Sequence, residues 1–151
     1  MADVKKIKPL TPDEEAFLRA LGRVMTILPR VADADMLEKH CISVVEYTVL
    51  VHLSEVPHNQ MRMSDLANMC GLSLSGMTRV VNRLESQSLV LREKSPDDGR
   101  AWLAVLTSAG RTQLKQAWPT NLASARRHIF SRLDDCDVAA AAKVLERIAP
   151  C

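Results

Sequence analysis

Apolar residues in the middle of the chain recur at three- and four-residue steps, which is the spacing of an amphipathic helix. Leu74, Met77, Val81 and Leu84 form this row, and we expect them to face a core. At about 100° of rotation per residue, the opposite side carries hydrogen-bonding side chains and few carboxylates. It consists of Ser75, Thr78, Arg79, Asn82, Arg83 and Ser86. Side chains of these types reach base edges and phosphates when a helix lies in a DNA major groove.

A second, shorter helix is predicted immediately before this one, over residues 63–70. Ser64 is placed to cap its first turn, Leu66 and Met69 supply an apolar side, and Gly71 ends it. Two short helices joined by a glycine-containing turn are typical of a helix-turn-helix. A helical hairpin with a purely structural role has the same pattern, so the motif alone leaves both interpretations open.

The segment that follows predicts a β-hairpin. Residues 89–94 and 101–106 have the composition of strands, and the Ser-Pro-Asp-Asp-Gly sequence between them is typical of a turn. Residues 61–63 are predicted to add a small third strand against it. A hairpin directly after such a helix is a wing, which favours DNA binding over the structural hairpin.

Both ends of the chain predict long helices with apolar rows. Thr11, Pro12 and Glu14 have the signals of a helix start, namely an N-cap, a proline at the first position and a capping box. A kink or break is expected over residues 26–30, because Pro29 removes a backbone hydrogen bond. The apolar row of this first helix is Phe17, Leu21, Val24, Leu28 and Val31.

Three further helices complete the pattern. Ser43 and Glu46 form a second capping box, opening a helix to about Ser54 with Val45, Val49 and Leu53 inward. Thr107 caps a helix toward Arg132 that Pro119 is expected to bend, with an apolar row of Leu114, Trp118, Leu122, Ala125 and Ile129. A last helix follows residues 134–135, with Val138, Ala141, Leu145 and Ile148 in line.

These elements predict a mostly α fold with a small β-hairpin wing. Residues 43–107 are expected to form a winged helix-turn-helix, flanked by helical dimerisation segments at 1–42 and 108–151. The terminal rows are too long to be covered by one small winged domain. A symmetric homodimer built from the first helix and the last two would bury them.

Composition agrees with a globular protein, since 47% of the 151 residues are hydrophobic and 25% are charged. No apolar run reaches the length of a membrane span, and the first residues lack a signal-peptide core, so a cytoplasmic protein without membrane contact is expected. The net charge of +2 is small for a DNA-binding protein. It leaves open a winged-helix protein-interaction module without specific DNA binding.

Two motifs carry a resemblance to a known family. The sequence from Asp98 through Arg100 to Leu106, Thr107 and Gly110 is similar to the D-x-R…L-T-x-x-G signature of MarR-family regulators, and residues 74–85 resemble that family's recognition helix. The resemblance implies a homodimeric winged-helix regulator of transcription. Such a protein binds pseudo-palindromic double-stranded DNA, often as a repressor, and is often released by small aromatic or oxidising signals.

The resemblance also implies roles for single residues. Arg100 is the wing-tip side chain that enters the minor groove, and Asp98 braces it. Gly99 stands where the family commonly has arginine, which lowers the charge of the wing. The DNA-binding surface is therefore expected to comprise Ser64, Ser73, Ser75, Gly76, Thr78, Arg79, Asn82, Arg83, Arg92, Lys94, Asp98 and Arg100.

Other chemistry has little support in the sequence. The four histidines stand apart, and no catalytic, metal-binding or phosphate-loop motif occurs, so neither an enzyme, a cofactor nor a metal site is expected. Cys41, beside His40, is the candidate for redox sensing, although a cysteine in such a chain is more often a small core residue. Met25 and Trp102 are candidate ligand contacts; the alternatives are a core filler and a strand anchor.

Overall fold

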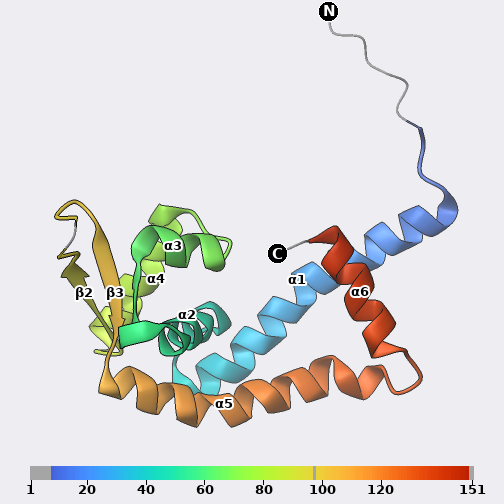
Figure 1. The fold of residues 1–151 in the computed structure, drawn as a ribbon. Coiled ribbons are helices and arrows are strands. Elements are labelled where there is room, and N and C mark those ends of the chain that lie inside the picture. Colours follow the sequence, from blue (N-terminus) through green and yellow to red (C-terminus); the bar gives the residue numbers. More distant parts are fainter. Residues whose placement is uncertain (1–7, 97, 150–151) are drawn as a thin grey trace, which may run out of the picture.

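The chain folds into a winged lobe from which two long helices extend (Figure 1). The computed structural model describes residues 8–96 and 98–149. In chain order the elements are α1 (Pro12–His40), α2 (Val44–Glu55), β1 (Gln60–Arg62), α3 (Met63–Met69), α4 (Leu74–Ser86), β2 (Val90–Lys94), β3 (Trp102–Leu106), α5 (Ser108–His128) and α6 (Val138–Ile148), with 3₁₀ turns at Pro57–Asn59 and Phe130–Arg132. None of the described helices is both long and apolar enough to cross a membrane.

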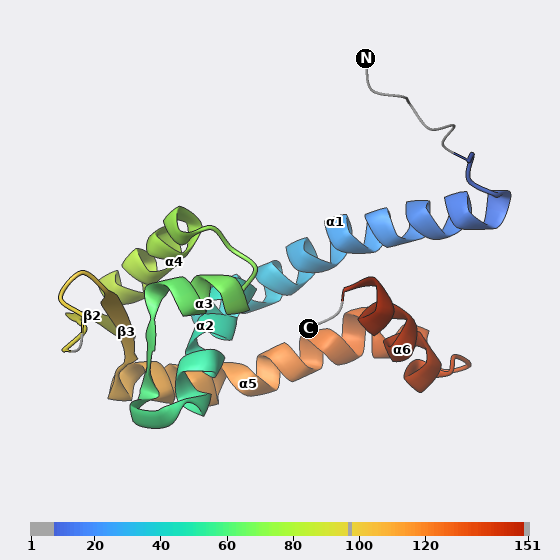
Figure 2. The same cartoon turned by 45° about the horizontal axis from the view of Figure 1, so that its top comes forward.

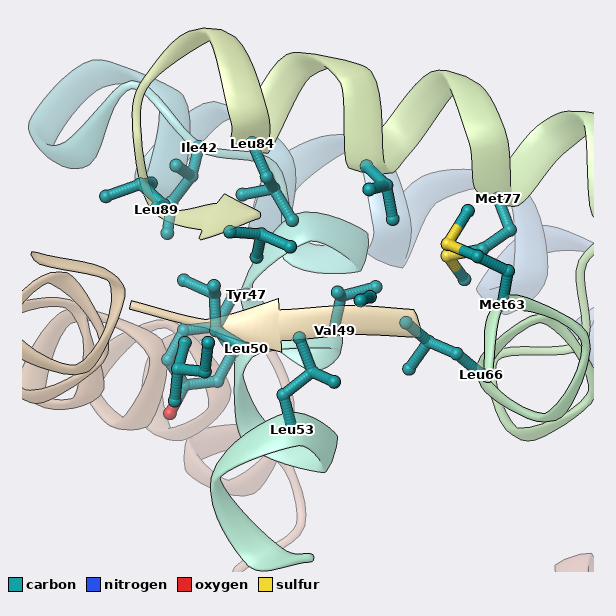
Figure 3. Packing of buried hydrophobic residues seen from close by; sticks show 14 of the residues in the cluster. Ile42, Tyr47, Val49, Leu50, Leu53, Met63, Leu66, Met77, Leu84 and Leu89 are labelled. Carbon is teal, nitrogen blue, oxygen red and sulfur yellow. The ribbon is translucent and has the colours of Figure 1, made fainter. Parts of the chain in front are cut away.

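The core of the lobe is centred on α2 (Figure 3). Val49, Leu50 and Leu53 on this helix are fully buried, and Val45, which was expected inward, is half-buried. Side chains from α3, α4 and the sheet pack around them, among them Leu66, Met77, Val81, Leu84 and Val90. Because neighbours cover α2 on several sides, its sequence is apolar nearly all round rather than along one row.

A three-stranded antiparallel sheet with the order β1-β3-β2 forms the wing. Met61 on β1 and Arg92 on β2 both pair with Ala104 on the central strand β3. The predicted third strand is therefore confirmed, one residue earlier than expected. The backbone N–H of Ser95 donates to the carbonyl of Ala101 over 2.9 Å and continues the hairpin toward its tip.

The helix-turn-helix is confirmed as α3 and α4, with Gly71 at a positive φ of 63° in the turn between them. The prediction that Ser64 caps α3 is wrong. Arg62, the last residue of β1, is the N-cap, so Ser64 lies inside the first turn and donates to Oδ1 of Asp65. Leu74 was also expected in the core, yet it is 56% exposed, because the first turn of α4 projects beyond the buried side chains of the lobe.

Both capping boxes are confirmed, and neither proline breaks its helix. The Thr11 and Glu14 pair starts α1, and the helix then continues through Pro29 for 29 residues without a break. One hydrogen bond is lost to the carbonyl of Met25, and on this exposed stretch water can replace it. Likewise, α5 continues through Pro119, although it ends at His128 rather than near Arg132.

Helices α1 and α5 contact each other beside the lobe and diverge away from it, as Figures 1 and 2 show. Met36 of α1 and Ala117 of α5 are fully buried at this contact. Polar contacts accompany them: Nε2 of His40 lies 2.8 Å from Oγ1 of Thr120, and Oδ2 of Asp35 lies 3.0 Å from Nε2 of His128. The N-terminal half of α1 and all of α6 contribute no buried residue.

Thr107 joins the lobe to α5. Its hydroxyl accepts from the N–H of Gly110, which caps α5, and donates to the carbonyls of Ser88 and Leu89 at 2.8 and 3.0 Å. Gly110 lies so close to Leu89 that a Cβ there would overlap the Leu89 carbonyl oxygen. The start of α5 is thus fixed to the turn that follows α4.

Candidate DNA-binding surface

Helix α4 presents one polar side to solvent and one apolar side to the core. Met77, Val81 and Leu84 are fully buried, whereas Arg79 and Asn82 on the opposite side are exposed. Within the described residues, the side chains of Arg79 and Asn82 have no hydrogen bond or ion pair with the rest of the chain. Their donors and acceptors are therefore available to another molecule.

The first turn of α4 is held by its own serines. The Ser73 hydroxyl accepts from the N–H of Gly76 at 3.1 Å and lies 3.1 Å from the Ser75 hydroxyl. Ser73 and Ser75 are both exposed. The amides of this turn carry the partial positive charge of a helix N-terminus, which suits a phosphate.

A cavity of about 740 Å³ separates α4 from the wing. Leu74 and Thr78 line it from α4, Ser64 from the start of α3, and Trp102 from β3. The Thr78 hydroxyl donates to the carbonyl of Leu74 over 2.8 Å, so its lone pairs remain available. Arg62, Arg92 and Arg100 also line this cavity, together with the carboxylates of Glu85 and Asp98.

The wing tip is braced from within. Oδ1 of Asp98 accepts from the N–H of Arg100 at 3.0 Å, and the Asp98 carbonyl accepts from the N–H of Ala101 at 2.9 Å. The Arg100 side chain is exposed. At the base of the tip, Nζ of Lys94 lies 5.9 Å from the centre of the Trp102 ring, within the range of a cation–π contact.

Two of the expected DNA contacts are paired with carboxylates of this chain. Nε and Nη2 of Arg92 lie 3.0 and 2.7 Å from Oε2 of Glu85 on α4. Nε of Arg83 lies 3.0 Å from Oε1 of Glu46, a carboxylate on α2 that is only 1% exposed. Both arginines therefore tie α4 to neighbouring elements.

The two candidate ligand contacts lie apart. Trp102 is 47% exposed and lines the cavity beside α4, so it is not the buried strand anchor that was the alternative. Met25 is 68% exposed on α1, and it is not among the residues that line this cavity. This cavity therefore does not bring the two side chains together.

The thiols show no reactive arrangement among the described residues. Cys41 is exposed at the C-terminal cap of α1, and the neighbouring His40 ring contacts Thr120, so redox sensing by Cys41 stays a prediction. Burial raises the pKa of the Cys70 thiol, which disfavours its reactive thiolate form. Cys151 lies outside the described residues. Within residues 8–96 and 98–149, no cluster of three His, Cys, Asp or Glu side chains is placed to hold a metal ion.

Sequence reasoning did not find the second role of Glu46. The capping box already explained why a glutamate stands at position 46. A carboxylate within an otherwise apolar helix, however, also indicates a buried partner. Leu74 was likewise not expected beside the wing, whereas residues 61–63 were expected there and only the place of Arg62 in the cavity lining was missed. The position of Leu74 depends on how the hairpin folds over α4, which no local pattern encodes.

Comparison with known proteins identifies the family. The sequence model of the MarR family matches residues 42–101. The structure of AbsC, a MarR family transcriptional regulator from Streptomyces coelicolor, is similar over 95% of this chain and 96% of that protein, with 34% identity and a TM-score of 0.85. The chain belongs to the MarR family. It is a DNA-binding transcriptional regulator of the winged-helix type.

Two further relatives agree with this assignment. Sco3205, a MarR family regulator from the same organism whose structure is a complex with DNA, matches over 95% of this MarR-family chain and 90% of its own, with 28% identity and a TM-score of 0.88. YdgJ of Bacillus subtilis, an uncharacterized HTH-type transcriptional regulator, is 31% identical over 70 residues. That match covers 46% of this chain and 40% of the length of YdgJ.

Proposed function

We propose that this MarR-family regulator acts as a homodimeric repressor that reads a pseudo-palindromic operator through α4. The observation that carries the proposal is the pair of exposed, unengaged side chains Arg79 and Asn82 opposite the buried side of that helix. Arginine pairs with guanine and asparagine with adenine in the major groove. A surface that only bound proteins would have no need of these two side chains in this arrangement.

The wing and the serines of the lobe complete the proposed surface. Arg100 enters the adjacent minor groove from a tip that Asp98 holds in shape. Lys94 supplies positive charge beside it, and Ser64, Ser73, Ser75, Gly76 and Thr78 contact phosphates or sugars. The DNA complex formed by the related Sco3205 supports this placement of the lobe on a duplex.

Dimerisation is proposed to occur through residues 1–42 and 108–151. Exposed apolar side chains gather on the helices of these segments, including Phe17 and Val24 on α1, Trp118 on α5, and Leu145 and Ile148 on α6. Covering them with a second copy removes them from water. The two α4 helices of such a dimer must lie about 34 Å apart to enter successive major-groove turns.

A small aromatic acid is the proposed signal for release. The cavity between α4 and the wing offers Trp102 and Leu74 to a ring. It offers Arg62 and Arg100, whose side chains pair with no carboxylate among the described residues, to a carboxylate. An acid bound there would occupy space beside α4 and compete with DNA directly.

Base readout is tested by measuring binding to a duplex that the parent protein selects from a randomised pool and to random duplex. Arg79→Ala or Asn82→Ala should weaken the selected complex by about 1–3 kcal/mol and the random complex less. Gln87→Ala, an exposed change at the C-terminal cap of the same helix, serves as the control. Equal losses on both duplexes would refute base readout, and a parent protein without sequence preference would favour the protein-interaction module.

Salicylate titrated into the parent complex tests the signal. It should loosen the complex, and Trp102→Ala should reduce that response more than Leu91→Ala, a change at an exposed position on β2, does. A complex that salicylate leaves unchanged contradicts the proposed ligand class without affecting the proposed readout.

A further inference from the structure

Helix α4 is held on both flanks by ion pairs of the lobe. Residues 83 and 85 are two positions apart, so their side chains leave the helix about 200° apart around its axis. Glu85 pairs with Arg92 of the wing on one flank, and Arg83 pairs with Glu46 of α2 on the other. The buried row of Met77, Val81 and Leu84 lies between these flanks on the inner side.

Glu46 is the more firmly fixed of the two carboxylates. It is 1% exposed, and its Oε2 accepts from the N–H and the hydroxyl of Ser43 at 2.6 and 3.0 Å. Ser43 follows the corner between α1 and α2, where the N–H of Val44 also donates to Oδ1 of Asp33 over 2.7 Å. Oε1 accepts no hydrogen bond from the described residues, and Arg83 Nε lies 3.0 Å from it as an ion pair.

The Arg83 side chain, by contrast, is 61% exposed and has a long flexible stem. A solvent-exposed arginine beside a duplex would otherwise move freely toward phosphates. The buried carboxylate keeps it on the α2 side of the helix, because Glu46 has no other cation paired with it among the described residues. The ion pair therefore limits how far α4 can roll about its own axis.

We infer that Glu46 is a positioning residue for DNA readout: acting through Arg83, it fixes the rotation of α4 that directs Arg79 and Asn82 at the bases. This inference rests on the proposed readout by α4. Base recognition requires the reading side chains to be held to within about 0.5 Å and 10–20°. A small roll of the helix is therefore enough to lose discrimination while α4 stays folded.

Glu46→Gln tests the inference, because glutamine keeps the shape of glutamate and loses the charge. We expect the ratio of affinities for the selected and random duplexes to fall about tenfold. Glu93→Gln is the matched control: it makes the same charge change on an exposed part of β2 and should strengthen both complexes alike. A ratio in Glu46→Gln that equals the ratio in Glu93→Gln would overturn the inference.

Arg83 variants separate positioning from direct contact. Arg83→Gln should lower the affinity ratio as Glu46→Gln does, and it leaves the capping box of α2 intact. Arg83→Lys should keep most of the parent ratio, since an ion pair needs only the charge. A bidentate base contact needs the planar guanidinium. If both Arg83 variants lose discrimination and Glu46→Gln keeps it, Arg83 reads a base and the inference is wrong.

A stability measurement without DNA distinguishes a failure of the ion pair from a failure of the proposed base reading. Urea unfolding is measured for Glu46→Gln, for Arg83→Gln and for the variant that carries both changes. The unfolding equilibrium constant of the double variant should differ about threefold or more from the value expected if the two changes acted independently. Additive changes would overturn the pairing itself. A coupled pair in a parent protein that shows no sequence preference would instead refute the proposed readout, and with it the role assigned here to Glu46.

Discussion

At the scale of single residues, the close approach of Gly110 to Leu89 connects the reading lobe to α5. A side chain at position 110 would overlap the Leu89 carbonyl oxygen and lie 2.7 Å from Cδ1 of Leu106. Neither atom moves easily, because the carbonyl already accepts from the Thr107 hydroxyl and the Leu106 side chain is buried. The glycine of the L-T-x-x-G motif thus has a packing reason independent of any ligand.

Gly110→Ala should therefore destabilise the protein, although alanine is the better helix former. Overpacking of this kind costs about 1–3 kcal/mol, and urea unfolding followed by circular dichroism measures it. Gly99→Ala at the wing tip, where a Cβ meets nothing within 4 Å, should change the free energy of unfolding by less than about 0.5 kcal/mol. Equal stabilities of the two variants would contradict the packing at Gly110.

At the scale of elements, the contact between α1 and α5 depends on Asp35. Its carboxylate lies 3.0 Å from His128 Nε2 and 3.4 Å from Arg127 Nη1. The hydroxyl of Ser124, a hydrogen bond with His128 and the charge of Arg127 hold the pKa of Asp35 below its ordinary value, against the opposing effect of burial. The ionised carboxylate therefore stabilises the folded contact.

A lowered pKa in the folded state fixes the pH dependence of this contribution. It is fully present above the unfolded pKa of about 3.9 and is lost as pH falls through the folded value. Asp35→Asn should therefore reduce the free energy of unfolding at pH 7, and the difference from the parent should vanish in strong acid. Asp134→Asn, an exposed position, should show no such dependence. A pH-independent loss in Asp35→Asn would mean that the charge does not contribute.

Elements whose ends are set by local sequence signals, such as capping boxes and turns, were predictable from sequence. Capping boxes at Thr11 and Ser43 predicted two helix starts, and the turn sequence at residues 95–99 between two strand-like segments predicted the hairpin. Contacts between distant segments were not predictable. The spacing of Arg83 along α4 says nothing of a carboxylate on α2, and Leu74 fits the apolar period although the lobe ends before reaching it.

At the scale of the whole molecule, the helices outside the lobe expose an unusual amount of apolar surface. Phe17 and Val24 are 48% and 54% exposed, and Leu145 and Ile148 are 54% and 51% exposed. Nothing among the described residues covers them. Exposed apolar side chains in such number support the proposed interface between two copies of the chain.

Replacing Leu145 and Ile148 together with aspartate should convert the proposed dimer to a monomer, because two charges cannot be buried in an apolar contact without partners. Light scattering on the full chain measures the mass. Leu91→Asp, at a similarly exposed position on β2, should leave the dimer intact. A dimer that survives the double substitution would place the interface elsewhere.

The rigid joint at Gly110 also has a mechanical consequence. Because the lobe is fixed to the start of α5, the 21 residues of that helix act as a lever arm, roughly 31 Å long at 1.5 Å per residue. A tilt of about 6° at its far end displaces the reading lobe by about 3 Å, close to the 3.4 Å rise of one base pair. An angular change too small to disturb any single contact is thus enough to put the two halves of a dimer out of register with their operator.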